Sequence, residues 1–158
     1  MISEAHLQSA CCDLVAGVVR IHGKVHLKVA GASMVPALWP GDLVTVRSCD
    51  SSELQPGSIV VFRQNERLVV HRLMHWVGDC VVARGDALSR CDQPVKAGEV
   101  LGCVDSVLRN GRSVSLQPSL WHSVLAPVFR RSEWCASLYL RLSSRVQRLG
   151  FCAATCEY

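Results

Sequence analysis

Residues 31–42 read GASMVPALWPGD and place one serine, Ser33, among small side chains. Pro36 fixes the backbone three residues later, and a Gly-Asp pair ends the stretch before an apolar run at residues 43–46. This order of residues predicts a tight bend between two strands. We expect the bend to expose the hydroxyl group of Ser33.

Strand-like patterns surround this bend on both sides. Apolar and polar side chains alternate over residues 24–29 before it, and short strands follow it, separated by turns that contain Gly, Pro or Asn. Apolar residues recur every three or four positions over residues 3–22, which is typical of an amphipathic helix. The sequence therefore predicts a mainly β, antiparallel fold with an N-terminal helix. The strands expected after the bend are residues 43–47, 58–63, 67–77, 80–84, 99–108 and 113–116, with a polar loop at 85–98.

The composition changes near residue 117. Residues 132–149 carry apolar side chains on one helical face and arginines on another, so we expect a basic, amphipathic C-terminal helical appendage. Such a helix could dock on its own domain or contact a membrane surface, and the pattern leaves both open. We therefore expect an N-terminal helix at residues 1–24, a β domain at 25–117 and a helical tail at 118–158.

Length and composition narrow the class of protein. A chain of 158 residues, 49% of them hydrophobic, can bury one sizeable core, and a net charge of +4 without a dense basic patch argues against nucleic-acid binding. Nine cysteines at irregular spacing favour reduced thiols and give no zinc pattern, so we expect no metal and no cofactor. We find neither a run of about 20 apolar residues nor a secretory signal. We expect a cytoplasmic protein, or one attached to membranes peripherally through its tail.

Ser33 requires a base within hydrogen-bond reach, because an isolated serine hydroxyl is a poor nucleophile at neutral pH. His71 is the candidate, since a neutral imidazole can accept the serine proton. On a strand, Leu73 and His75 would share the face of His71, while Trp76 would point away. His75 would lie roughly 13 Å further along the strand and could not reach the same serine.

Two carboxylates follow in the loop after residue 84. Asp86 and Asp92 are six positions apart, and either could accept a hydrogen bond from the His71 ring. Such a bond fixes the tautomer and stabilises the imidazolium that forms during acyl transfer. The pattern leaves open which of the two aspartates orients the base.

Five segments, in this order, resemble the signal peptidase I family in its archaeal and endoplasmic-reticulum type, which uses Ser, His and Asp. That family shows S-M-x-P-x-L-x-x-G-D, G-D-I-V-V-F, V-H-R-V, K-G-D with a second Asp six residues later, and V-L-G-x-V. The resemblance spans about residues 25–107. The matching segments are SMVPALWPGD at 33–42, GSIVVF at 57–62, VHRL at 70–73, RGD at 84–86 with Asp92, and VLGCV at 100–104.

The resemblance implies the open β fold of the signal-peptidase and LexA-like clan. It also implies a serine endopeptidase that cleaves an extended peptide or a preprotein through an acyl-enzyme. Ser33 would be the nucleophile and His71 the base, in place of the lysine of the bacterial type. Asp86 or Asp92 would orient the base.

The family's oxyanion and substrate contacts carry over in part. The residue two positions before the nucleophile is often a serine in that family, but here it is Gly31. Backbone N–H groups of Ser33 and Met34 would therefore stabilise the oxyanion. Met34 and Pro36 would lie beside a substrate peptide that binds by strand addition.

Two other functions remain open. The form VAGASM at residues 29–34 is similar to the self-cleaving LexA-type repressors, although those use serine with lysine and no lysine stands near position 71. A self-processing regulatory module is one alternative, against which the 32 residues before Ser33 leave little room for a helix-turn-helix domain and a linker. A catalytically idle peptide-binding module is the other. Signal peptidases usually have a transmembrane anchor before the serine, and we see none.

Overall fold

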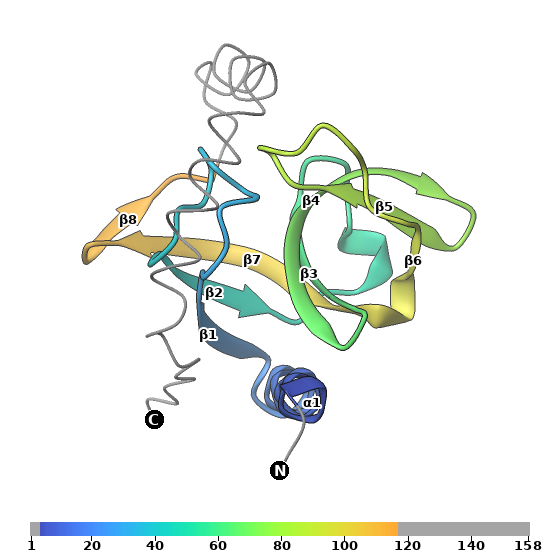
Figure 1. Cartoon of the computed structure of the whole chain (residues 1–158), viewed down its shortest axis with the longest axis horizontal. Helices are drawn as coiled ribbons and strands as arrows, with labels where there is room; N and C mark the ends of the chain where they lie inside the picture. The colour runs from blue at the N-terminus through green and yellow to red at the C-terminus, as the bar shows by residue number, and fades with distance from the viewer. Residues whose placement is uncertain (1–3, 117–158) are drawn as a thin grey trace.

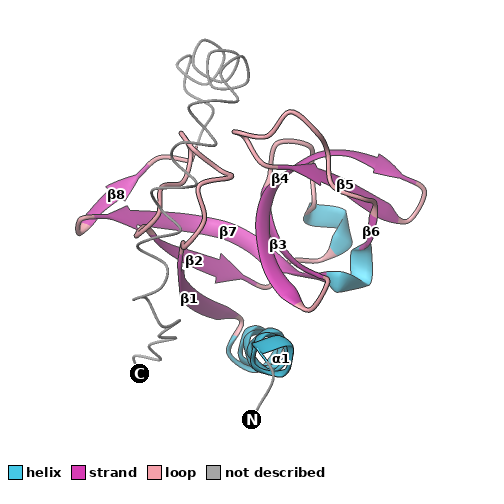
Figure 2. Ribbon diagram, viewed as in Figure 1, coloured by secondary structure: helices cyan, strands magenta, loops and turns pink. Residues whose placement is uncertain are grey.

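An eight-stranded antiparallel sheet makes up most of the computed structural model, which describes residues 4–116 (Figures 1 and 2). The predicted mainly β fold with an N-terminal helix is confirmed, and the predicted helical appendage lies outside the described residues. The elements are α1 (Glu4–His22), β1 (Lys24–Lys28), β2 (Leu43–Arg47), β3 (Ile59–Gln64), β4 (Arg67–Val77), β5 (Cys80–Arg84), β6 (Val95–Lys96), β7 (Val100–Arg109) and β8 (Arg112–Val114), with 3₁₀ turns at Ser51–Glu53 and Ala97–Glu99.

Strand β7 joins the two halves of this sheet. The strand order is β1-β2-β7-β3-β4-β5-β6, with β8 paired to β7 beside this path, so β7 lies between two strands that follow each other in sequence. On one side Val107 pairs with Val44 of β2, and on the other Cys103 pairs with Val60 of β3. Figure 1 shows β1, β2 and β8 to the left and the curled strands β3 to β6 to the right.

Buried side chains form two hydrophobic cores that share β3. Ile59 and Val61 point into the first core, whereas Val60 and Phe62 point into the second, because successive side chains of a strand alternate between its faces. The first core consists of Val15, Val19, Val25, Met34, Leu38, Val44, Val46, Ile59, Val61, Val104 and Val107. The second core consists of Leu54, Val60, Phe62, Leu73, Val81, Ala83, Val95 and Cys103.

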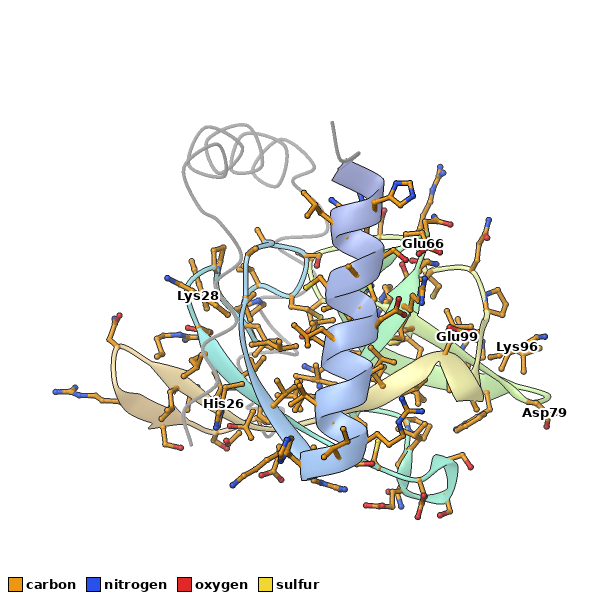
Figure 3. All side chains as sticks on the ribbon, turned by 90° about the horizontal axis from the view of Figure 1, so that it is seen from below. His26, Lys28, Glu66, Asp79, Lys96 and Glu99 are labelled. Carbon is orange, nitrogen blue, oxygen red and sulfur yellow. The ribbon has the colours of Figure 1, made fainter. Side chains whose placement is uncertain are left out.

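Helix α1 covers the first core with one face only. Val15 and Val19 are buried there, whereas Leu7, Leu14 and Ile21, seven residues apart, are each more than half exposed on another face. Figure 3, seen from below, shows the helix lying across the strands. Helix α1 therefore packs one apolar face on the core, as predicted, but it also carries a second, exposed stripe of apolar side chains.

A polar face of α1 contacts the hairpin formed by β3 and β4. The guanidinium of Arg63 contacts the carboxylate of Asp13 at 2.9 Å and the hydroxyl of Ser9 at 3.0 Å, and it also pairs with Glu66 at the tip of the hairpin. Glu66 lies beside the N-terminal half of the helix in Figure 3. These contacts set the position of the helix on the sheet.

The segment at residues 85–98 differs from the predicted loop. Val95 pairs with Val81, and Lys96 pairs with Cys80, so these two residues form the short strand β6. A strand of two residues is too short to show an alternating pattern in the sequence.

A β-bulge in β4 changes which side chains share a face. Leu73 pairs with Ala83, but His75 pairs with the next residue back, Val82, so Met74 is an extra residue in the ladder. The alternation therefore reverses after Leu73: Trp76 packs against the second core and His75 is exposed. The predicted orientations of His75 and Trp76 were wrong, because alternation along a strand holds only where the pairing is regular.

Candidate active site

Ser33 lies in the loop between β1 and β2. Two backbone hydrogen bonds of 2.8 Å between Val29 and residues 41–42 close the base of this loop. Beyond the base, Met34 and Leu38 are buried in the first core and hold the loop against the sheet. Ser33 itself is only partly buried, so its hydroxyl is held in a fixed bend that solvent can still reach.

His71 lies in the middle of β4, where it pairs with Val60. Its Nε2 is 3.0 Å from Oγ of Ser33. The residue is 6% exposed, and its ring makes an edge contact with Phe62, with the ring centroids 6.2 Å apart. The strand and this aromatic neighbour therefore hold the imidazole toward the serine.

Asp92 lies on the other side of the imidazole. Its Oδ2 is 2.6 Å from Nδ1 of His71, and the two side chains are 14% and 8% exposed. Because a carboxylate only accepts hydrogen bonds, Nδ1 carries the proton and Nε2 is left to accept from the Ser33 hydroxyl. The backbone N–H of Asp92 donates to the carbonyl of Ala83 at 2.9 Å, which returns the loop to the sheet at this point. The three side chains form a hydrogen-bonded chain with the geometry of a Ser-His-Asp triad.

Asp86, the other candidate acid, contacts a different side chain. Nε and Nη2 of Arg72 donate to its two carboxylate oxygens at 2.8 and 2.7 Å. Nη1 of Arg72 donates to the carbonyl of Gly57 at 2.8 Å. The structure therefore brings Asp92 to His71 and places Asp86 in an ion pair that holds the same loop on β4.

The loop at residues 85–92 also contacts the serine loop directly. The two loops rise beside each other at the top of Figure 1, and the N–H of Ala87 donates to the carbonyl of Ser33 at 2.9 Å. Gly85 is buried beneath this contact, where a Cβ atom would lie 2.6 Å from the same carbonyl oxygen. Because the peptide group between Ser33 and Met34 is planar, fixing this carbonyl also fixes the direction of the Met34 N–H.

Asp42, at the end of the 31–42 stretch, was not among the predicted site residues. It is 2% exposed, and Nε and Nη2 of Arg109 donate to its two oxygens at 2.9 and 2.7 Å, while the N–H of Trp39 donates at 2.8 Å. Burial alone would raise the pKa of Asp42, but the hydrogen bonds from Arg109 and Trp39 outweigh burial and hold that pKa below its ordinary value. The Gly-Asp pair that ends this stretch could have drawn attention to Asp42. Nothing in the sequence, however, indicates that Arg109 is the partner of Asp42. This ion pair binds the serine loop to the end of β7.

The two residues predicted to lie beside a substrate differ in exposure. Met34 is 2% exposed, so its side chain belongs to the first core and only its backbone is near the site. Pro36 is partly exposed, and its carbonyl accepts a hydrogen bond from Nε1 of Trp39 at 3.0 Å.

Residues 118–158, with the predicted basic tail and its membrane contact, lie outside the described part of the chain. Within residues 4–116, the structure contains no helix that is both long and apolar enough to cross a membrane. In the same range, no three side chains of His, Cys, Asp or Glu gather as the ligands of a metal ion would.

The chain was compared with known protein families. The family model described as Peptidase S24-like matches residues 4–83, just over half of the chain. The matched span includes Ser33 and His71 and ends before Asp86 and Asp92. A search of the curated proteins found no match.

Proposed function

The chain belongs to the Peptidase S24-like family, and on that premise we propose that it is an active serine endopeptidase. The observation that carries the proposal is the hydrogen-bonded chain of Ser33, His71 and Asp92, with contacts of 3.0 and 2.6 Å. Family membership supports the serine peptidase clan, and the contacts of His71 with Ser33 and Asp92 support the proposed roles of base and orienting acid. Of the two candidate acids, we propose Asp92.

In the proposed reaction, Oγ of Ser33 attacks a peptide carbonyl while Nε2 of His71 takes its proton. Asp92 stabilises the imidazolium through the hydrogen bond to Nδ1. The tetrahedral intermediate then breaks the C–N bond as His71 returns the proton to the leaving amine. Water attacks the acyl-enzyme by the same route, with His71 again as base, and releases the acid product and free Ser33.

The oxyanion would be stabilised by backbone N–H groups of Ser33 and Met34. The hydrogen bond between Ala87 and the Ser33 carbonyl supports this part of the proposal, because it fixes the peptide group that carries the Met34 N–H. A donor held in place before the reaction costs no reorganisation when charge develops.

We propose that the substrate is an extended peptide or preprotein, bound with small residues before the cut. This finer statement follows the resemblance to signal peptidase I, in which the base at position 71 is His and the segments at 57–62 and 100–104 recur in the same order. Those two segments lie on the adjoining strands β3 and β7, and β3 also pairs with β4, the strand that carries His71. No membrane contact is needed for this chemistry.

Self-processing is a second candidate, which the Peptidase S24-like match and the VAGASM form at residues 29–34 favour. It predicts that the purified chain cuts itself at a rate independent of its concentration, and that Ser33→Ala stops the cut. Cleavage of an added peptide library by a chain that stays intact would instead support an endopeptidase acting on other molecules.

The test of the proposed function is labelling of Ser33 with a phosphonylating probe, read by intact mass. Wild type should gain one probe mass, located to Ser33 by peptide mapping. Ser33→Ala should gain none, and His71→Ala should label at least about a hundredfold more slowly. Circular dichroism of each variant reports whether its fold is intact.

An intact wild-type chain that takes up no probe would contradict the proposal and favour an idle peptide-binding module. Equal labelling of wild type and His71→Ala would contradict the role of the histidine, even if Ser33 reacts.

A further inference from the structure

Two cysteines far apart in the sequence meet at the edge of the second core. Cys49 lies two residues after β2, and Cys103 lies on β7, 54 positions away. Their Sγ atoms are 2.6 Å apart. The bond length of a disulfide is about 2.05 Å, so a shift of roughly half an ångström would bring the sulfurs to bonding distance. Both thiols are free in this structure.

The surroundings of the pair favour a reactive thiolate at Cys103. Contact with Cys49 and the positive charge of Arg47 lower the pKa of Cys103 and outweigh burial, which raises it, while contact with Cys103 raises the pKa of Cys49. Arg47 is itself held by Glu53 at 2.7 Å and by Asp105 at 3.8 Å. Of the two sulfurs, Cys103 is therefore the one that loses its proton more readily, and a thiolate is the form of cysteine that attacks a peroxide.

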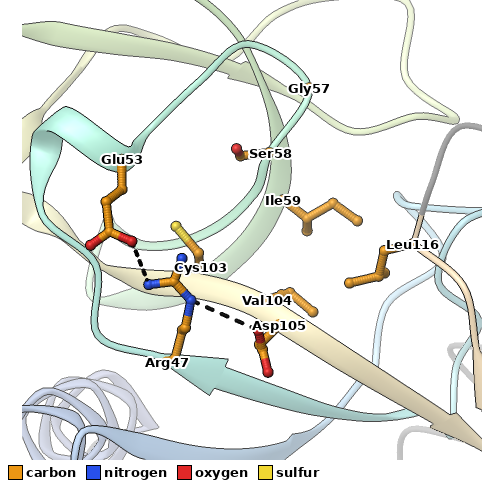
Figure 4. A pocket seen from close by; sticks show the side chains of 9 residues that line it. All are labelled: Arg47, Glu53, Gly57, Ser58, Ile59, Cys103, Val104, Asp105 and Leu116. Carbon is orange, nitrogen blue, oxygen red and sulfur yellow. Dashed lines mark ion pairs between the residues drawn. The ribbon is translucent and has the colours of Figure 1, made fainter.

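A small molecule can reach Cys103 through a pocket of about 200 Å³. Figure 4 shows its wall, with Cys103 beside Arg47 and Glu53 on one side and Ile59 and Leu116 on the other. Cys103 is 7% exposed in total, so the pocket wall is where its sulfur can meet a reagent of the size of hydrogen peroxide.

We propose that Cys49 and Cys103 form a disulfide when the protein meets a peroxide. The Cys103 thiolate attacks one oxygen of hydrogen peroxide, which breaks the O–O bond, releases hydroxide and leaves a sulfenic acid. The Cys49 sulfur then attacks the Cys103 sulfur and displaces the hydroxyl group, which leaves as water with the proton that Cys49 gives up. The hydroxide from the first step takes up the proton that Cys103 lost when it ionised. In total two thiols are oxidised, and one peroxide is reduced to two waters.

The new bond would link the segment after β2 to β7 and close a loop that contains β3, β4, β5 and β6. This loop includes His71 and Asp92, whereas Ser33 lies outside it. A cross-link restricts the unfolded chain and so favours the folded state. Oxidation therefore stabilises the fold, and the link between two already adjacent sulfurs leaves the active site in place.

The test is peptide mapping of the full chain, because trypsin places the two residues on peptides 48–63 and 97–109, each with a single cysteine. Wild type treated with hydrogen peroxide should yield these two peptides as one linked species, which dithiothreitol separates. Cys49→Ser should yield no linked species and should instead keep an oxidised Cys103. Cys91→Ser, which changes an exposed cysteine on peptide 91–96, is the matched control and should still give the link.

A second readout is the midpoint of urea denaturation, which should rise on oxidation of wild type and of Cys91→Ser but stay unchanged in Cys49→Ser. Over-oxidation of Cys103 in wild type without a link, or links between either cysteine and the other thiols, would overturn the proposal. Both readouts use wild type itself, and neither depends on whether the chain is a peptidase.

Discussion

At the scale of single residues, two aspartates in one loop make different contacts. Asp92 lies 2.6 Å from the imidazole of His71, whereas Asp86 makes two hydrogen bonds to the guanidinium of Arg72. Both side chains are less than 15% exposed, so each contact forms away from bulk water. Changing each aspartate to asparagine should therefore have different effects on the reactivity of Ser33 and on the stability of the fold.

We predict that Asp92→Asn slows probe labelling of Ser33 at least about a hundredfold with little change in stability. Asp86→Asn should lower the free energy of unfolding by about 2–4 kcal/mol, because it leaves Arg72 without its charged partner. Its labelling rate should fall less than tenfold. Urea denaturation and labelling kinetics of both variants check this, and the reverse pattern would assign the orienting role to Asp86.

Gly85 is the residue whose size the site constrains most directly. We predict that Gly85→Ala slows labelling and lowers the free energy of unfolding by about 1–3 kcal/mol, since its Cβ would lie 2.6 Å from the Ser33 carbonyl. Gly98→Ala is the control, because a Cβ there meets nothing within 4 Å. Equal effects of the two changes on stability and labelling would contradict this account.

The sequence predicted part of this site and could not predict the rest. Ser33 and His71 could be predicted as nucleophile and base from local patterns, and the structure brings their side chains to 3.0 Å. The sequence alone could not distinguish Asp86 from Asp92 as the partner of His71, because the answer depends on where a loop returns to the sheet. Arg109 was missed for a related reason, since its contact with Asp42 joins residues 67 positions apart.

At the scale of the elements, the ion pair between Asp42 and Arg109 connects the serine loop to β7. The pKa of Asp42 is lower in the folded chain than in the unfolded chain, so the ion pair adds stability at all pH values above the unfolded pKa, about 3.9. That contribution is lost as the pH falls through the folded pKa. Acid should therefore weaken the attachment of the serine loop.

We predict that Arg109→Leu lowers the free energy of unfolding by about 2–4 kcal/mol at pH 7 and removes this loss of stability in acid. Without Arg109, burial favours a protonated Asp42, so the variant should be less sensitive to acid than wild type. Urea denaturation at neutral and acid pH gives the comparison. Arg112→Leu, at an exposed position on β8, should keep the wild-type dependence, and parallel curves for wild type and Arg109→Leu would count against the assignment.

The two faces of α1 give a matched pair of changes on one helix. Val15 is 1% exposed in the first core, so Val15→Ala should cost about 2 kcal/mol of unfolding free energy. Leu14 is the next residue toward the N-terminus and is 58% exposed, so Leu14→Ala should change that energy by less than about 0.5 kcal/mol. Thermal or urea denaturation distinguishes them. A large cost at Leu14 would mean that another surface covers the exposed stripe.

The elements were predictable where periodicity is regular. Helix α1 and strands β1 to β5 follow from apolar patterns with periods of 3.6 and 2 residues. The bulge at Met74 could not be read in this way, because it depends on how β4 pairs with β5. Strand β6 was not predicted from the sequence, because its two residues form a strand only through their pairing with β5.

At the scale of the whole molecule, the two cores share β3, so they should unfold together. We predict that Val60→Ala in the second core and Val61→Ala in the first each lower the free energy of unfolding by about 2–3 kcal/mol. Circular dichroism should give one urea transition for each variant. Hydrogen exchange should lose protection equally in β2 and β5, whereas loss confined to one of these strands would show that the cores unfold separately.

The fold class was predictable from the sequence, but the order of the strands in the sheet was not. Alternation along residues 99–108 predicts a strand without saying which strands lie beside it. The placement of β7 between β2 and β3 depends on pairings such as Val60 with Cys103, which no local pattern encodes. The predicted domain boundaries at residues 24 and 117 stay predictions.

The position of β7 has a consequence for a chain emerging from the ribosome. Ser33 belongs to the half of the sheet made by β1 and β2, and His71 belongs to the half made by β3 to β6. Strand β7, which separates and joins the two halves, is synthesised after both of them. We expect a nascent chain that ends between about residues 92 and 109 to hold every group of the triad without assembling it, so that reactivity begins only when synthesis has passed the last strand that the site requires.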